Sequence, residues 1–133
     1  MSQENVEVVR KWAEYYNRRD MDGLVSIIDT DHEKKSIFAA ASGGTFKGHS
    51  GFPFAYFEAI DDAYDHFSLE ALEYVDAGAA VVMAADCEWH GKESGAEGKT
   101  RVFITFWLRA GKVFREETFT DRTEAMAAVG LSE

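Results

Sequence analysis

Histidines are the side chains of this protein best suited to bind a metal or to transfer a proton near neutral pH. The chain has four of them, His32, His49, His66 and His90. A zinc-binding helix carries two histidines four residues apart beside a glutamate, and His32-Glu33 begins that pattern, which then fails at Ser36. The other histidines lack this spacing, so we predict no metal site and no other cofactor.

Two further strings match catalytic motifs at one end only. Gly98-Lys99-Thr100 has the last residues of a phosphate-binding loop, but the glycine needed five residues earlier is replaced by Glu93. The string Gly48-His49-Ser50-Gly51 begins like a nucleophile elbow, yet its closing glycine would be Phe52. We therefore expect neither a nucleotide site nor a serine nucleophile.

Length and composition predict one domain over residues 1–133. A hydrophobic content of 46% in 133 residues is enough for a buried core. The net charge of -10, without a basic cluster, argues against nucleic acid and anionic membranes as partners. Cys87 has no disulfide partner in the chain, and no signal peptide or long apolar stretch is present, so we predict a cytoplasmic protein.

An apolar stripe at helical spacing marks the start of the chain. Val9, Trp12, Ala13 and Tyr16 follow one another at intervals of three and four, which predicts a helix to about residue 19. Asp20 is a suitable N-cap for a second helix, which the polar residues 29–31 should end. The two helices should form a hairpin with its aromatic side chains inward.

The hydrophobic period then changes from 3.6 to 2, which predicts an α+β fold. We expect strands over residues 34–40, 67–75, 80–90, 100–109 and 113–120, a third helix over 50–61, and a last helix capped by Asp121. The last three strands are joined by turns, so they should form an antiparallel meander.

One strand of the meander is apolar on both faces. Phe103, Thr105 and Trp107 alternate along it with a second row, made of Val102, Ile104, Phe106 and Leu108. A strand of this kind must be covered on both sides. The helices can cover one side, and we expect a second subunit to cover the other, so the sequence predicts a homodimer.

The order and spacing of several short segments resemble the nuclear-transport-factor-2-like superfamily, and within it the SnoaL-like, or polyketide cyclase-like, group. The segments are residues 8–31, Asp76-Ala77-Gly78, Gly111-Lys112-Val113 and Asp121-Arg122. The resemblance implies a cone in which a strongly curved, mostly antiparallel sheet wraps around the helices. It also implies an apolar pocket between the helices and the sheet.

Compared by position with ketosteroid isomerases of this superfamily, the chain has changed three groups that their chemistry uses. The oxyanion-hole tyrosine falls on Trp12, the catalytic aspartate on Ser36, and the protonated aspartate on Thr105. Ser36 cannot take up a proton as a carboxylate does, so we do not expect isomerase activity. The acid/base aspartate of the cyclases falls on Thr118.

Glu116 is the carboxylate that the resemblance places inside the cone. Two interpretations stay open for it. Burial among aromatic groups would raise its pKa and suit it to acid/base catalysis, whereas an ion pair with Lys34, also placed inside, would make it structural. Two interpretations also stay open for Tyr56 and the aromatic residues of the first helix: they either line the pocket or pack in the core.

The resemblance predicts a pocket for a small apolar or aromatic molecule. Its lining would be Trp12, Tyr16, Lys34, Ser36, Tyr56, Met83, Cys87, Trp89, Phe103, Thr105, Trp107 and Thr118. The row of Val102, Ile104, Phe106 and Leu108 would then lie on the convex face and form the dimer interface. Two classes of function remain, a cofactor-independent acid/base enzyme and a non-catalytic binding or dimerisation module.

Overall fold

The computed structural model describes residues 2–131, which form one α+β unit. Its elements, in chain order, are α1 (Ser2–Arg18), α2 (Met21–Ile27), β1 (Ile28–Lys35), the 3-10 segment η1 (Ile37–Ser42), β2 (Thr45–Lys47), the π-helical segment η2 (Ser50–Ala55), α3 (Tyr56–Ala63), β3 (Tyr64–Asp76), β4 (Ala80–Gly91), β5 (Glu97–Arg109), β6 (Lys112–Phe119) and α4 (Arg122–Ala127). None of the helices in this described part has the length and apolar character needed to cross a bilayer.

The helical hairpin at the start of the chain is confirmed. Val9, Trp12 and Tyr16 of α1 are all buried, as their spacing predicts. The Asp20 side chain accepts a hydrogen bond from the Gly23 amide at 2.9 Å and so caps α2. α2 ends at Ile27, and β1 begins at the next residue.

The strands within residues 2–131 form one sheet in the order β2-β1-β6-β5-β4-β3. All neighbouring strands are antiparallel except β1 and β6, which run parallel. The meander of β4, β5 and β6 is confirmed, and β3 extends it. Because the parallel pair joins a strand from the first third of the chain to the last strand, it brings distant residues side by side.

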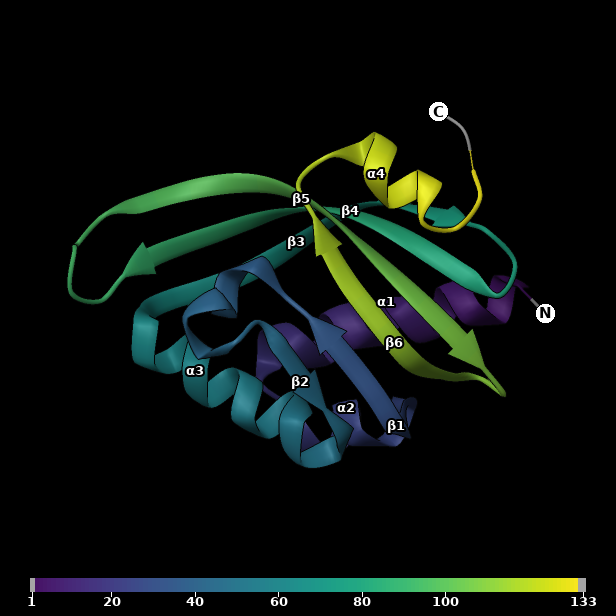
Figure 1. Cartoon of the computed structure of the whole chain (residues 1–133), viewed down its shortest axis with the longest axis horizontal. Helices are drawn as coiled ribbons and strands as arrows, with labels where there is room; N and C mark the ends of the chain where they lie inside the picture. The colour runs from purple at the N-terminus through teal and green to yellow at the C-terminus, as the bar shows by residue number, and fades with distance from the viewer. Residues whose placement is uncertain (1, 132–133) are drawn as a thin grey trace.

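Helices pack on both faces of the sheet. Helices α1, α2 and α3 lie on its concave side, here called the inner face, while α4 lies on the opposite, outer face (Figure 1). The main core fills the space between the inner face and these helices. A second, smaller group of side chains lies under α4 and is called the outer cluster, made of Val82, Ala84, Phe103, Ala125 and Met126.

The predicted faces of β5 are wrong. The row that we assigned to a dimer interface lies in the main core, and its members are Val102, Ile104, Phe106 and Leu108. Phe103 instead belongs to the outer cluster, and the Thr105 hydroxyl donates to the Ala125 carbonyl of α4 at 3.3 Å. The chain therefore covers the outer face in part with its own last helix. A homodimer stays a prediction, but it cannot use the core row.

The chain between α2 and β2 also differs from the prediction. β1 covers 28–35 rather than 34–40, and the segment from Ile37 onward turns into η1. The inner face of β1 carries Ile28, His32 and Lys34, so two of its three inward residues are polar. Such a strand has no apolar alternation for a sequence reading to detect.

We predict that Phe106→Ala destabilises the fold by about 3–5 kcal/mol, because a fully buried phenylalanine leaves a cavity in the main core. Phe114→Ala is the matched control, since this side chain is half-exposed and packs against the Arg109 guanidinium. Urea unfolding of both variants measures the difference. If both variants lost the same small amount of unfolding free energy, the placement of Phe106 in the main core would be contradicted.

Candidate functional site

The parallel pairing of β1 with β6 builds a polar cluster inside the main core. Lys34 of β1 lies directly opposite Glu116 of β6 in the register of the two strands. His32 precedes Lys34 by two residues and points to the same face. The cluster therefore combines residues that are more than 80 positions apart in the sequence.

Glu116 is the centre of this cluster. Its Oε1 accepts a hydrogen bond from Lys34 Nζ at 2.6 Å. Its Oε2 accepts from His32 Nε2 at 2.8 Å and from Trp12 Nε1 of α1 at 3.1 Å. All four side chains are buried, so the carboxylate is held by donors from two strands and a helix and is sealed from solvent.

The Lys34 ammonium lies in an aromatic cage. Its Nζ is 5.1 Å from the ring centroids of Trp12 and Phe52 and 4.7 Å from that of Tyr56. A desolvated ammonium over an aromatic face gains about 2 kcal/mol. The cage and Glu116 together replace the water that this charge would otherwise need.

The charges nearby keep Glu116 ionised in spite of its burial. Burial by itself raises the pKa of this carboxyl, but the Lys34 ammonium and the hydrogen bond from His32 act in the other direction. Their sum lowers the pKa below its ordinary value. Of the two interpretations that the sequence left open, the structure contains the ion pair between Glu116 and Lys34.

A second group of polar side chains, linked through their hydroxyls, lies beside the Lys34 ammonium. The hydroxyls of Tyr16 on α1 and Tyr56 on α3 are 2.5 Å apart. The Ser36 hydroxyl also interacts with Tyr56. Burial raises the pKa of Tyr56, so both phenols keep their protons at neutral pH. These groups can donate hydrogen bonds, but they cannot serve as bases.

His32 has one ring nitrogen without a partner. Its Nε2 is used by Glu116, whereas Nδ1 has no hydrogen-bond partner among the described residues, and the side chain is fully buried. A buried polar atom left without a partner costs about 1–3 kcal/mol. His32 Nδ1 is thus the one buried side-chain nitrogen or oxygen without a hydrogen-bond partner in the part of the chain that is described.

Most of the predicted pocket residues do lie on the inner side of the sheet. These are Trp12, Tyr16, Lys34, Ser36, Tyr56, Met83, Cys87, Trp89 and, by its pairing with Ile104, Thr118. Burial raises the pKa of the Cys87 thiol to about 12, so it is no nucleophile at neutral pH. The interior around Lys34 is occupied by aromatic side chains of the protein itself.

Three predicted pocket residues lie elsewhere. Phe103 and Thr105 face α4 on the outer side, as described above. Trp107 also belongs to the outer row, where the Arg115 guanidinium stacks over its ring at 4.4 Å. The positional match of Thr105 to the isomerase aspartate is therefore wrong, because the side chain points away from the interior.

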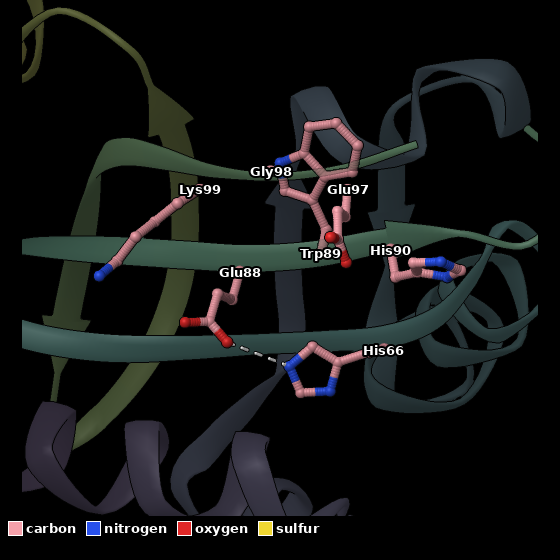
Figure 2. Close-up of a pocket in the computed structure, with 7 residues that line it drawn as sticks. All are labelled: His66, Glu88, Trp89, His90, Glu97, Gly98 and Lys99. Atoms are coloured by element: carbon pink, nitrogen blue, oxygen red, sulfur yellow. Dashed lines mark ion pairs between the residues drawn. The ribbon is translucent and has the colours of Figure 1, made fainter. Parts of the chain in front are cut away.

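A separate open hollow of about 540 Å³ lies at the far end of β3, β4 and β5. It is lined by His66, Glu88, Trp89, His90, Glu97, Gly98 and Lys99. Figure 2 shows the Trp89 ring crossing β5 at Gly98, and His66 turned toward Glu88. His66 Nε2 lies 3.6 Å from Glu88 Oε1. A Cβ atom at Gly98 would lie 2.7 Å from the indole, so the glycine is needed there. This hollow is apart from the Glu116 cluster.

His32 is the functional residue that the sequence reading missed. The reading began the strand at residue 34, and it considered His32 only as part of a failed zinc motif. The signal was present in the alternation of His32, Lys34 and Ser36, which puts all three on one face of an extended chain. It was overlooked because polar residues rarely mark the buried face of a strand.

The fold is shared with solved structures of distant sequence. A protein of unknown function from Burkholderia pseudomallei, described as nuclear-transport-factor-2-like, is 18% identical, with a TM-score of 0.79 over 96% of this chain and 98% of that one. TerC, co-crystallised with polyporic acid, is 21% identical, with a TM-score of 0.78 over 95% and 98%. A protein of ketosteroid-isomerase-like fold from Catenulispora acidiphila, in complex with trimethylamine, is 17% identical, with a TM-score of 0.74 over 94% and 93%.

These likenesses show that the chain has the nuclear-transport-factor-2-like fold, as its sequence predicts. No protein-family model and no curated protein sequence matches the chain. At such low identity the comparison defines the fold alone, and the function has to be argued from the chain's own residues.

We predict that Glu116→Gln destabilises the protein by about 3–5 kcal/mol, because the change leaves the Lys34 ammonium buried without a counter-charge. Glu117→Gln is the matched control. Its side chain is partly exposed and lies 3.5 Å from the half-exposed Arg115 guanidinium, so loss of the pair should cost less than about 1 kcal/mol. Chemical denaturation compares the two, and an equal loss in both variants would refute a buried ion pair.

Proposed function

We propose that this protein binds a small, largely apolar molecule between its helices and the inner face of the sheet, with the Glu116 cluster at the polar end of the site. The observation that carries the proposal is the ionised Glu116, held by Lys34, His32 and Trp12 inside an aromatic interior. Binding sites for small molecules commonly combine apolar walls with a few well-placed polar groups.

The free-energy cost of burying the charged side chains of the cluster supports a role beyond stability. A buried ion pair contributes no more to stability than apolar side chains of similar volume, and often less. The main core could therefore be filled without His32, Lys34 and Glu116. Perturbed charged groups in an otherwise apolar interior are typical of functional sites.

The geometry favours binding over acid/base catalysis by Glu116. A general base needs a pKa near the working pH and a free lone pair facing the proton that it removes. Glu116 has a lowered pKa, and both of its oxygens accept hydrogen bonds from the protein. Isomerase chemistry lacks support for the same reason, since the Trp12 N–H that would stand in for the oxyanion donor is bound to Glu116.

The related structures support a ligand in this fold. TerC was solved with polyporic acid, and the protein from Catenulispora acidiphila with trimethylamine. Both share the fold of this chain at TM-scores above 0.7. The aromatic cage around Lys34 favours an aromatic or polycyclic ligand here, because flat rings pack well against aromatic side chains.

We predict that an apolar probe such as 2-methoxynaphthalene shifts the indole N–H signal of Trp12 and leaves that of Trp107 in place. Trp12 lies in the interior and donates to Glu116, whereas Trp107 lies on the outer face under Arg115. A heteronuclear NMR titration with indole nitrogens labelled reports both positions in one sample. Movement of Trp107 alone, or of neither indole at saturating probe, would contradict an interior binding site.

A further inference from the structure

The proton on His32 can be placed by charge balance. Lys34 and Glu116 form one complete ion pair, with no further acidic group in hydrogen-bond contact with the cluster among the described residues. A protonated His32 would add a second buried cation without a counter-charge, which is strongly unfavourable. Charge balance therefore favours a neutral His32, and its single N–H is then on Nε2, because a carboxylate oxygen can only accept.

The Nδ1 atom then carries a free lone pair inside the protein. It has no partner among the described residues, and the whole side chain is sealed from solvent. The nearest aromatic neighbour given by the ring geometry is Phe52, at 5.3 Å between centroids, and a phenyl ring has no N–H or O–H to donate. Among the described residues, His32 Nδ1 is thus a buried hydrogen-bond acceptor without a donor.

The donors nearest to Glu116 are bound to it. The Trp12 N–H and the Lys34 ammonium are bound to Glu116, and the remaining faces of the ammonium meet aromatic rings. Tyr16 and Tyr56 share one hydrogen bond, in which either hydroxyl can be the donor. The unpartnered buried atom among the described residues is His32 Nδ1, an acceptor that a ligand with only a carbonyl oxygen would leave unsatisfied.

We propose that His32 Nδ1 accepts a hydrogen bond from the bound molecule, and that the ligands of this site carry a hydroxyl of the phenol or enol type at their polar end. The inference rests on the proposed binding function and names the chemistry that the ligand must have. Glu116 acts through His32 as a positioning residue, since its bond to Nε2 fixes the tautomer and the ring orientation. A phenolic O–H is a stronger donor than an aliphatic alcohol and matches an imidazole acceptor.

The test compares 2-naphthol with 2-methoxynaphthalene, which has the same ring system without the O–H. In the unmodified protein we expect 2-naphthol to bind about tenfold more tightly, the usual worth of one well-formed hydrogen bond. His32→Gln keeps an N–H for Glu116 but puts no acceptor at the Nδ1 position, because its amide oxygen lies one bond further along the side chain, so it should remove the preference. His66→Gln is the matched control, because this exposed histidine lines the open hollow at the far end of β3, β4 and β5.

The outcomes separate the two proposals. If neither probe shifts the Trp12 indole signal, the binding function fails. Equal affinities of the two probes for the unmodified protein, with Trp12 responding to both, would overturn the role of His32 alone. A His32→Gln variant that still binds 2-naphthol more tightly than 2-methoxynaphthalene would also overturn the role of His32.

A measurement on the unmodified protein covers the case in which His32→Gln does not fold. Nitrogen-15 NMR distinguishes a protonated from an unprotonated ring nitrogen. We expect the free protein to show His32 with an unprotonated Nδ1, and we expect 2-naphthol, but not its methyl ether, to shift that signal toward a hydrogen-bonded position. A proton on Nδ1 in the free protein, or identical responses to both probes, would refute the inference.

Discussion

The interior of this protein depends on a carboxylate that has been taken out of water. Glu116 remains ionised because Lys34, His32 and Trp12 supply the hydrogen bonds and the positive charge that burial removes. Those partners come from β1 and α1, so the carboxylate fixes how the first helix and the first strand meet the last strand. An unpaired charge at this depth would cost several kcal/mol, which makes the arrangement nearly all-or-none.

The sheet has helices on both faces, and the Glu116 cluster lies on its inner face. α4 packs on the outer face and buries its own small group of side chains, while α1 and α3 cover the inner face. The inner face holds Lys34 and Glu116 among aromatic rings. Many apolar contacts stabilise the fold, whereas a few polar contacts around Glu116 form the candidate site.

Much of the fold was predictable from the sequence, because the helical stripe of α1, the Asp20 cap and the turn at Gly78 are local signals. The faces of β5 were not, since both rows are apolar and a one-residue change in the preceding loop exchanges them. Glu116 and Lys34 were found only through a family resemblance. His32 was missed because its role arises from the pairing of β1 with β6, a contact between strands far apart in sequence.

The central claim is that Glu116 and Lys34 are energetically coupled inside the core, and a double-mutant cycle tests it most directly. The cycle uses Glu116→Gln, Lys34→Met and the double variant, each measured by chemical denaturation. We expect the double variant to be more stable than the sum of the single losses predicts, with a coupling of about 2–3 kcal/mol. Additive losses, with a coupling near zero, would contradict the account, because they would mean that the two charges do not depend on each other.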